Sequence, residues 1–517
     1  MKKVVRGEYL KDKMEEAIDL LCGTVKQTLG PMGNNVIIDH SSFQPFITND
    51  GVTIAKNIES DDEVVGAIIE IAKEASIKTD ENVGDGTTTT LVLLESLINL
   101  SRKYIDKGIN PLVLKKSLLA KLDEIIEKLE ELKIEATLDN LKNIANVSAN
   151  DHDIGALVCD IVQNIDEKHA ITIKERSETI LEAKYIKGYS CPIVHPSEYY
   201  FQDKKNISSD EAYILIINDF VSDIECISDI LNEAMVNEKT LVIVAKDFDD
   251  YFVNEIISLN FEGKIRCFMV KISEYGVHAR IIEKDLEIIT GAHIVEKSTN
   301  ITGADIGKIK HLYLDKEVLK LSYWEDIKLS DYIGNIEEEI KNIEDEFDRE
   351  FYQRRKAMFT KGMVEINIGA PTKTECHERR MRLDDAICST YAAKKGILPG
   401  GGIALLKVAE SIDDESEASL IWKATLKKPF EQIMLNAFLD AEEIKEKIKS
   451  EDYQKIYNVC TDGYENVNET NIVDAFLVVR NSLINACSIA NMLLSTTSLV
   501  INEYQNNINK VNDYTEI

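Results

Sequence analysis

The stretch NVGDGTTTTLVLL, residues 82–94, places one carboxylate and four hydroxyls directly before an apolar run. Asp85 and Thr87–Thr90 are poor residues for a helix interior. They suit a helix N-terminus, where free backbone N–H groups need acceptors and the helix dipole is positive. Glycine lets such N–H groups approach a ligand closely, and N–H groups at a helix start bind anions. Two interpretations follow: a helix capped by Asp85 or a threonine, and a phosphate-binding helix start.

Two further glycine-rich segments lie far from this one in sequence. TLGPMGNN occupies residues 28–35, and LPGGGIALL occupies residues 398–406, where three glycines open a helical pattern. No lysine follows the glycines in the way that the P-loop pattern G-x-x-x-x-G-K-[ST] requires. A single glycine cluster is more often a turn than a ligand site. The three segments can form one ligand site only if the fold brings them together.

Carboxylates near these segments suggest what the ligand would be. Asp85 would repel phosphate unless a cation lay between them, and a carboxylate with phosphate oxygens is the usual environment of Mg²⁺. Asp50, in the turn ITNDGVTIA, and the pair Asp384-Asp385, in a predicted helix ahead of the triple glycine, could orient a water that attacks a γ-phosphate. Each acid alone could equally be a turn residue or part of a solvated helix face. Residue types alone leave nucleotide binding and structural capping as alternatives.

Composition narrows the function classes. The chain has 517 residues, enough for two to four domains, and 91 acidic against 60 basic residues give a net charge of −31. This charge argues against binding to nucleic acid or to an anionic membrane surface. The nine cysteines contain no C-x-x-C pair, which disfavours a zinc or redox motif and indicates free thiols. No apolar leader or membrane-length apolar run is visible, so we expect a cytoplasmic protein.

The elements that must position these residues follow a helical, then α/β, then helical order. Apolar spacing predicts helices over 9–30, 62–77, 87–104 and 112–132, with short strands at NNVIIDH and PFITND. After about residue 170, β-branched runs such as AYILIIND and KTLVIVAKD alternate with helical stretches, which predicts an α/β domain with a substantially parallel sheet. From about Gly334 the pattern is helical, with a stripe of Ile336, Ile340, Ile343, Phe347 and Phe351. We therefore expect an α/β domain inserted into a helical one.

Several motifs together resemble those of a known family. They are TLGPMGNNVII, ITNDGVTIAK, VGDGTTTTLVLL, VSAN, LDDAICSTYAAKKGILPGGGIALL and IVDAFLVVRNSLINACSIA, in this order and spacing. The chain resembles the large subunit of GroEL-like group I chaperonins. The resemblance implies a multidomain α+β fold with a mostly helical equatorial domain, a small α/β intermediate hinge domain and an inserted α/β apical domain. The implied bounds are 1–130 and 396–517 for the equatorial domain, 131–178 and 364–395 for the intermediate domain, and 179–363 for the apical domain.

The resemblance also implies a function. It predicts an ATP-dependent chaperone that captures non-native polypeptides and promotes their folding in a cavity closed by a GroES-like co-chaperonin lid. ATP, Mg²⁺ and K⁺ are the implied cofactors, and the implied assembly is a homo-oligomer of two stacked seven-membered rings. The alternative is a chaperonin-derived interaction protein with an impaired folding cycle.

Site residues carry over by matching motif. Asp50 and Asp385 are the implied hydrolytic carboxylates, Asp85 the Mg²⁺ ligand, and Thr28 and Thr88 the border of a K⁺ site. Because Asp385 belongs to the predicted hinge domain, it would reach the nucleotide only when that domain swings down. The implied ATP contacts are Thr28, Leu29, Gly30, Pro31, Asn49, Gly51, Asp85, Gly86, Thr87, Thr88, Thr89, Gly401, Asn458, Val459 and Asp474.

The implied polypeptide-binding surface is apolar, as sequence-independent capture of unfolded chains requires. Its residues are Tyr189, Ile193 and Val194, from KGYSCPIV, and Leu231, Val253, Ile256 and Ile257 on two helices. The alternative for these residues, and above all for the helix positions, is an ordinary core role. The chain departs from the family pattern at Asn49, where lysine is usual, and at Ile193-Val194, where tyrosine and phenylalanine are usual, and it lacks a Gly-Met-rich tail.

Overall fold

The chain divides into two compact units. A computed structural model describes residues 2–40, 43–149, 151–165, 170–197, 199, 206–298, 301–324, 329–343, 345–467 and 469–502. The helical unit joins Met1–Cys159 with Met381–Ile517, and the inserted unit is Asp160–Arg380. The insertion of an α/β unit into a helical one is therefore confirmed. Both boundaries fall inside helices, α7 (His152–Asn164) and α13 (Lys373–Lys394), and the finer division into three domains stays a prediction.

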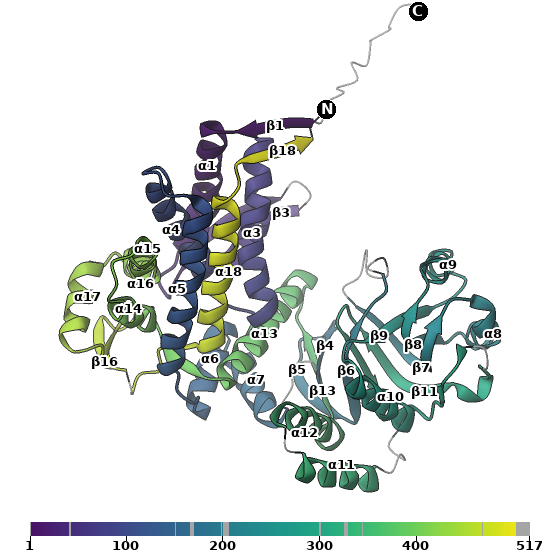
Figure 1. Cartoon of the computed structure of the whole chain (residues 1–517). Coiled ribbons are helices and arrows are strands. Elements are labelled where there is room, and N and C mark those ends of the chain that lie inside the picture. The colour runs from purple at the N-terminus through teal and green to yellow at the C-terminus, as the bar shows by residue number, and fades with distance from the viewer. Residues whose placement is uncertain are drawn as a thin grey trace, which may run out of the picture. The chain divides into compact units, whose positions relative to one another are not determined.

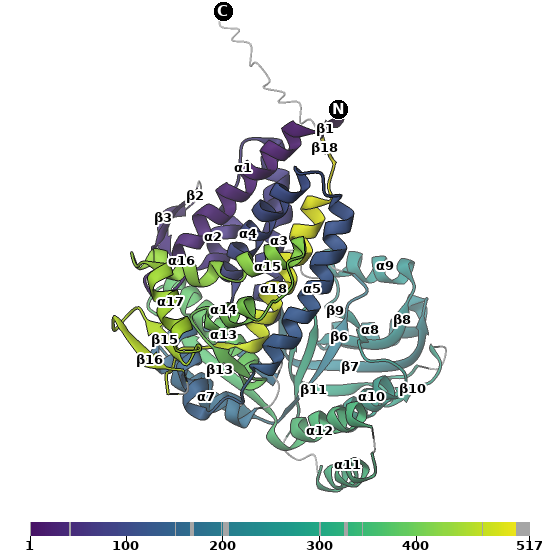
Figure 2. The same cartoon turned by 60° about the vertical axis from the view of Figure 1, so that its left-hand side comes forward.

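The core of the helical unit is a bundle drawn from both ends of the chain (Figures 1 and 2). Its long helices are α1 (Glu8–Val25), α3 (Glu63–Val83), α4 (Thr87–Ile105), α5 (Pro111–Glu131) and α18 (Phe476–Leu494). The C-terminal helix α18 packs against α3, α4 and α5. The four helices predicted from apolar spacing are confirmed, although the first ends at Val25 and continues as a short 3-10 turn, Lys26–Thr28.

Helix α18 differs from the expectation that no apolar run would approach membrane length. It is, among the described helices, the one that is long and apolar enough to cross a membrane by length and composition. Its residues Leu483, Ala486 and Cys487 are buried in the main core cluster of the helical unit. Burial of this kind is what a central bundle helix needs, and such a helix passes the same test.

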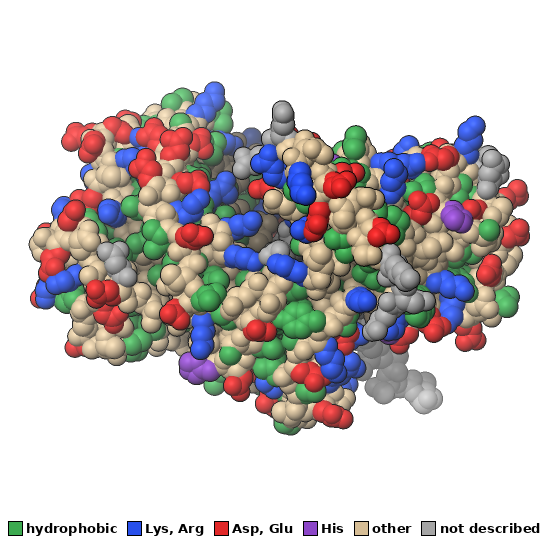
Figure 3. All heavy atoms as spheres, turned by 90° about the horizontal axis from the view of Figure 1, so that it is seen from below, with side chains coloured by type: hydrophobic (Ala, Val, Ile, Leu, Met, Phe, Trp, Pro, Cys, Tyr) green, Lys and Arg blue, Asp and Glu red, His purple; other side chains and the backbone are tan. Residues whose placement is uncertain are grey.

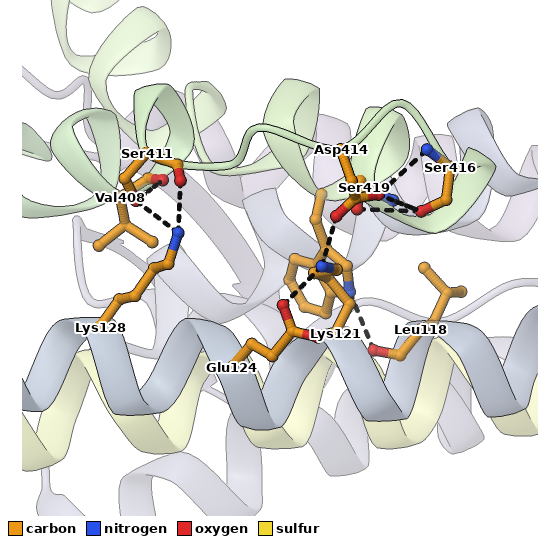
Figure 4. Close-up of polar contacts among 10 residues, drawn as sticks. Leu118, Lys121, Glu124, Lys128, Val408, Ser411, Asp414, Ser416 and Ser419 are labelled. Carbon is orange, nitrogen blue, oxygen red and sulfur yellow. Dashed lines mark hydrogen bonds and ion pairs between the residues drawn. The ribbon is translucent and has the colours of Figure 1, made fainter.

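Helix α5 shows how the sequence forms and anchors one bundle helix. Asn110 caps its first turn by accepting from the Leu112 N–H, and Pro111 occupies its first position. The apolar residues repeating every three or four positions, Leu118, Leu122, Ile125 and Leu129, are buried. The buried Trp422 of α15 (Glu417–Thr425) donates its ring N–H to the Leu118 carbonyl at 3.0 Å (Figure 4). These contacts bind the N-terminal helices to the C-terminal ones.

Two short antiparallel ribbons lie at the edge of this bundle. One pairs β1 (Lys2–Arg6) with β18 (Ser498–Asn502). The other pairs β2 (Val36–His40) with β3 (Phe43–Thr48), the two short strands that the sequence predicted. Each ribbon carries a pair of opposed apolar side chains that are exposed: Val4 with Val500, and Ile37 with Ile47. Isolated two-stranded ribbons are marginally stable, so both have the properties of surfaces that another element covers.

Shorter elements complete the helical unit. They are α2 (Gly51–Asn57), α6 (Leu138–Ala149), α14 (Ile403–Glu410), α16 (Lys428–Asn436), α17 (Ala441–Ser450), β14 (Ile397–Pro399), β15 (Lys455–Asn458), β16 (Gly463–Asn466) and β17 (Val473–Ala475). Strand β14 pairs with β17, and β15 pairs with β16. Both pairs lie close to the glycine-rich segments discussed below.

The inserted unit is built on a seven-stranded sheet with the order β10-β7-β11-β12-β6-β9-β8, closed by a further pairing of β7 with β8. The strands are β6 (Gly188–Val194), β7 (Ile207–Val221), β8 (Thr240–Phe248), β9 (Cys267–Ile272), β10 (Ile294–Val295), β11 (Gly307–Leu314) and β12 (Val318–Ser322). Only the pairings of β7, β8, β9 and β10 with one another are parallel. The prediction of a parallel sheet is confirmed for the strands whose runs suggested it, β7 to β10. It does not hold for the whole sheet, because β6, β11 and β12 add antiparallel pairings, among them the β11–β12 hairpin.

A smaller sheet in the same unit has the order β4-β13-β5, from β4 (Ile171–Arg176), β5 (Leu181–Ile186) and β13 (Met363–Gly369). The helices of the unit are α8 (Ser228–Val236), α9 (Asp250–Phe261), α10 (Val277–Thr290), α11 (Ser330–Asn342) and α12 (Glu346–Lys361). The predicted apolar stripe from Ile336 to Phe351 is split between α11 and α12, because the chain is extended at Ile343. Ile336 and Phe351 are buried, whereas Phe347 is exposed.

Candidate active site

The GDGTTTT segment forms an uncapped helix start. Gly86 is the N-cap of α4 with φ +82°, and within the described chain no side chain caps this helix. Asp85 accepts instead from the N–H of Gly86, at 2.6 Å. The interpretation that Asp85 or a threonine caps α4 is therefore excluded. By contrast, α3 is capped by Asp62, which accepts from Val64 and Val65. The first-turn N–H groups of α4 are thus available to an external acceptor.

The start of α2 is packed against the threonines of α4. Asp50 is the N-cap of α2 and accepts from the N–H of Val52 at 3.3 Å and of Thr53 at 2.9 Å. A Cβ on Gly51 would lie 2.3 Å from Thr88 Oγ1 and 2.9 Å from Thr87 Oγ1. Only glycine fits there, so the backbone after Asp50 lies directly against the two hydroxyls. The Asn49 side chain, just before Asp50, is exposed.

The TLGP segment also reaches the threonines. Thr28 is buried, donates to the Val25 carbonyl at 2.9 Å, and places its Oγ1 3.4 Å from Thr88 Oγ1. Leu29, Gly30 and Pro31 follow in a loop, with Gly30 at φ +85°.

An asparagine that the sequence analysis did not single out holds this loop. The Asn436 amide donates to the carbonyls of Lys26 at 3.0 Å and Leu29 at 2.9 Å. No local signal could identify Asn436, because its partners lie about four hundred residues earlier in the chain.

The triple glycine starts α14 in the same uncapped way. Gly402 is its N-cap at φ +80°, and among the described residues no side chain caps it. Gly401, at φ +61°, packs against Ile456 of β15, and Gly400 packs against Ile472 and Val473. Across β14 and β17, Leu398 pairs with Asp474. The fold therefore brings the triple glycine to the side of Asp474.

Asn458 and Val459 end β15 at the same corner. Asn458 shares a face of β15 with Ile456, because side chains two residues apart in a strand point the same way. Its side chain accepts from the Cys460 N–H at 3.0 Å and donates to Glu465 Oε1 at 2.5 Å. In this structure the amide therefore fixes the hairpin turn, and its predicted contact with a base or sugar stays a prediction.

Asp385 lies on α13, close to the GDG segment. Cys388, one turn beyond it, lies against Gly84, where a Cβ would be only 2.1 Å from the Cys388 Cβ. The helix that carries Asp385 thus packs directly on the GDG segment. Burial raises the pKa of the Asp385 carboxyl to about 8, and the charges of Asp50, Asp80, Asp85 and Asp384 add to this shift.

The pKa values of the Asp474 and Asp85 carboxyls are raised as well. Burial, with the charge of Asp85, raises the pKa of Asp474 to about 7. Burial also raises the pKa of Asp85, opposed by the Gly86 N–H and supported by the charge of Asp50. Asp85 nevertheless stays exposed to solvent, and Asp385 and Asp474 keep partial access.

Acids from four distant sequence positions thus repel one another at one place. Such repulsion is relieved when a cation binds, because an opposite charge favours the ionised carboxylates. Next to them lie the two helix starts without a side-chain cap, which suit an anion. The arrangement fits a ligand that brings both, namely a nucleotide phosphate with a divalent metal ion.

The polypeptide-binding residues predicted on the inserted unit need correction. Of the seven, only Val194 is exposed; the six buried ones are Tyr189, Ile193, Leu231, Val253, Ile256 and Ile257. The four helix residues belong to a core cluster shared with β7, β8 and β9. The alternative of an ordinary core role is what the structure shows for them. The residues implied by the resemblance lie on the inward face of each helix, where a binding surface would need the outward face.

Tyr189 has a structural role of its own. Its hydroxyl donates to Asp285 at 2.7 Å, and Arg355 binds the same buried carboxylate through two nitrogens at 2.9 and 2.7 Å. Tyr332 donates to it as well, at 2.6 Å. This network ties β6, α10, α11 and α12 together, so Tyr189 cannot also face a client.

A surface groove of about 320 Å³ lies between α5 and the start of α15, lined by residues such as Val113, Lys121 and Ser416. Among its described lining residues are none of the predicted site residues. Figure 4 shows the contacts beside it: Lys121 reaches Asp414 at 2.6 Å, and Lys128 binds Ser411. We interpret the groove as a crevice between bridged elements, separate from the carboxylates.

The family of the chain follows from comparison with known proteins. Residues 21–226 and 222–503 match the TCP-1/cpn60 chaperonin family, and the chain belongs to that family. The fold is similar to that of the chaperonin gp146 from the bacteriophage EL 2 (Pseudomonas aeruginosa), whose crystals were obtained in the presence of ATP-BeFx. For crystal form II the TM-score is 0.73 at 19% identity, covering 97% of this chain and 99% of that one. For crystal form I the TM-score is 0.63 with the same identity and coverage.

These matches confirm the resemblance that the motifs indicated. The chain is a divergent chaperonin with a GroEL-like multidomain α+β fold. At 19% identity the structural likeness establishes the fold and leaves the chemistry to the residues of this chain.

Proposed function

We propose that this chaperonin is an ATPase that uses ATP hydrolysis to time the capture and folding of non-native polypeptides. The observation that carries this proposal is the convergence of Asp50, Asp85, Asp385 and Asp474 beside the uncapped start of α4. The comparison protein gp146 was crystallised in the presence of ATP-BeFx, which supports a nucleotide as the ligand class.

Each part of the site has a proposed task. The N–H groups and hydroxyls of Thr87, Thr88 and Thr89 hold phosphate oxygens, because they open the uncapped α4. Asp85 contributes a carboxylate to Mg²⁺, and Thr28 and Thr88 provide oxygens for K⁺. Bound Mg²⁺ neutralises charge on the phosphates. Among the described residues no three His, Cys, Asp or Glu side chains could hold a metal ion by themselves, so phosphate oxygens and water complete the proposed Mg²⁺ site.

Asp50 and Asp385 orient the attacking water and accept its proton in this proposal. A carboxyl can accept a proton only when it is ionised. The raised pKa of Asp385 therefore suits a residue that is protonated without ligand and becomes active when a cation lowers its pKa.

Assembly into rings explains the two exposed ribbons. The apolar pairs Val4 with Val500 and Ile37 with Ile47 lie on different ribbons of one chain. A head-to-tail contact, repeated around a closed ring, would cover one ribbon with the other on the neighbouring copy. We propose two stacked seven-membered rings, closed by a GroES-like lid, in a cytoplasmic setting.

The capture surface that we propose uses the outward faces of α8 and α9. Met235 and Val236 of α8 are exposed, as are Tyr251 and Phe261 of α9. Both helices cover the same core cluster, so these side chains share one side of the sheet. They are large exposed aliphatic and aromatic side chains, which suits binding to unfolded chains.

Surface charge is consistent with this role. Figure 3 shows both acidic and basic side chains on the face of the molecule that it draws. The net charge of −31 keeps such a surface well solvated and repels acidic client segments.

The test is ATP turnover by the full chain and by single-site variants. We expect K⁺-stimulated hydrolysis in the wild type, loss of hydrolysis with retained ATP binding in Asp385→Ala, and a strong decrease in Asp50→Ala. Glu375→Ala removes an exposed carboxylate from the first turn of the same helix and serves as the control, with turnover near that of the wild type. A wild type that binds clients but never hydrolyses ATP would support the alternative, a chaperonin-derived interaction protein.

A further inference from the structure

A buried polar network lies directly behind the first turn of α4. The side chains of Thr90 and Ser482 are fully buried. Three donors converge on the Gly86 carbonyl: the Thr90 N–H at 2.9 Å, the Thr90 hydroxyl at 2.8 Å and the Ser482 hydroxyl at 3.2 Å. Because a carbonyl can only accept, both hydroxyls must donate to it.

A second layer supports the first. Thr79 of α3 places its Oγ1 3.1 Å from Thr90 Oγ1, and the Asn485 amide of α18 donates to Thr79 at 2.9 Å. The only hydroxyl hydrogen of Thr90 points to Gly86, so Thr90 accepts in its contact with Thr79. The hydrogen of Thr79 is shared between Thr90 and the Ala75 carbonyl, which lies at 2.8 Å. Donors therefore run from Asn485 through Thr79 and Thr90 to Gly86.

This network acts on the peptide that opens α4. The Gly86 carbonyl and the Thr87 N–H belong to one planar peptide group. Fixing the carbonyl fixes the direction of the N–H, and hydrogen bonds to the carbonyl make that N–H a stronger donor. The peptide is also held by packing, since a Cβ on Gly86 would lie 2.6 Å from Val478 Cγ1 and 2.8 Å from Ser482 Oγ.

We propose that Thr90 and Ser482, backed by Thr79 and Asn485, are positioning residues that aim the first N–H of α4 at the nucleotide phosphates. The inference rests on the proposed function, because it takes the ligand of α4 to be a nucleotide. These residues act through the Gly86–Thr87 peptide and do not touch the ligand. Because α18 begins two residues after Asp474, one rigid helix joins the network to the opposite side of the site.

The experiment compares matched removals of a buried hydroxyl from α4 in the full chain. Thr90→Val deletes the hydroxyl and keeps the shape, and Thr90→Ser keeps the hydroxyl. Ser96→Ala is the control, because Ser96 is a buried residue of the same helix whose hydroxyl bonds Thr425 at 3.1 Å, away from Gly86. Calorimetric titration measures binding of Mg²⁺·ADP and of adenosine, which lacks phosphate.

We expect Thr90→Val to bind Mg²⁺·ADP about fivefold more weakly than Ser96→Ala does, as the loss of one hydrogen bond implies. Adenosine affinity should be unchanged, and Thr90→Ser should restore ADP affinity. If Thr90→Val does not fold, Ser482→Ala provides the same comparison, because it removes only the more distant bond to Gly86.

The outcomes separate the two proposals. Equal ADP affinity in Thr90→Val and Ser96→Ala, with a wild type that binds ADP, overturns the positioning role and leaves the proposed function standing. An equal loss of ADP and adenosine affinity also overturns it. Adenosine has no phosphate, so such a loss would come from a general disturbance of the site and not from a change in the direction of one N–H group. A wild type that binds no ADP overturns both.

Discussion

Burial, together with the charges of neighbouring acids, keeps the pKa of the Asp385 carboxyl high. Four acids raise its pKa together with burial, to about 8, and Asp474 follows at about 7. A ligand-free protein holds such groups together only because part of the charge is neutralised by bound protons. Binding of the proposed Mg²⁺ would therefore displace these protons.

The first prediction concerns pH and stability. The folded-state pKa values of Asp385 and Asp474 lie above the ordinary value of 3.8, so the folded chain holds protons that the unfolded chain has released. The stability that these protons contribute is complete below about pH 4 and is lost as pH rises through 7 and 8. We expect the unfolding temperature of the ligand-free protein to fall over this range, by calorimetry, and Mg²⁺·ATP to reduce the fall.

Asp385→Asn provides the comparison, since it keeps the shape and cannot titrate. Its unfolding temperature should depend less on pH than that of the wild type. An identical pH dependence in the two proteins would contradict the assignment of the shift to Asp385.

The second prediction concerns Gly51. A Cβ there would press on the hydroxyls of Thr87 and Thr88, at 2.9 and 2.3 Å, so Gly51→Ala should displace the start of α2 from α4. We expect at least a tenfold loss of ATP affinity, measured by equilibrium titration. Gly23→Ala, in the last turn of α1 with its nearest contact at 3.4 Å, should leave affinity unchanged and add up to about 1 kcal/mol of stability. Equal affinities in the two variants would show that Gly51 does not support the site.

At the scale of elements, α8 and α9 each have a buried face and an exposed face, and the proposed capture surface uses only the exposed one. Tyr251 is 74% exposed on α9, whereas Ile256 of the same helix is fully buried. Tyr251→Ser should weaken binding of a non-native polypeptide severalfold and leave the unfolding transition in place. Ile256→Ser should cost about 3 kcal/mol or more of stability, because it leaves a cavity and an unpaired hydroxyl in the core.

Binding of a labelled unfolded protein and urea unfolding, measured on both variants, check this pair. If Tyr251→Ser binds the unfolded protein as tightly as the wild type does, the outward face of α9 is not the capture surface.

The ribbons lead to a prediction about assembly. Ile37 and Ile47 face each other across β2 and β3, and both are exposed. A charge in this pair should oppose burial against a neighbour without disturbing Ile38, which packs into the core. We expect Ile47→Glu to shift the protein from rings to single chains in light scattering. Phe347→Glu, an exposed apolar site in the inserted unit, is the control and should still form rings. Rings that persist in Ile47→Glu would argue against the ribbon contact.

Elements were predictable where the signal is local. The periodic helices α3, α4 and α5 follow from apolar spacing, and β2 and β3 from their β-branched runs. The split between α11 and α12 was missed because apolar spacing continues across Ile343, where the backbone is extended. Asn436, Ser482 and Asn485 were missed because their partners come from other elements, hundreds of residues away. Periodicity reports on local structure, and such contacts are set only by tertiary packing.

For the whole molecule, motif order carried more information than composition. Charge and cysteine usage excluded classes of protein, but only the spacing of TLGPMG, GDGTTTT and PGGG indicated a chaperonin, which the family match confirms. The helical unit assembles from both chain ends because α18 packs between α3, α4 and α5. That arrangement places Asp474 beside residues of the N-terminal segment, and the insertion of residues 160–380 leaves it intact.

The account as a whole depends on ATP hydrolysis at these carboxylates driving protein folding. The most direct measurement is the yield of a chemically unfolded client refolded by the full chain with and without Mg²⁺, K⁺ and ATP, for the wild type and Asp385→Ala. We predict that the wild type raises the yield only with ATP, whereas Asp385→Ala binds ATP and client but does not turn over. ATP-dependent refolding of equal yield and rate through repeated cycles in Asp385→Ala, or none in the wild type, would contradict the account.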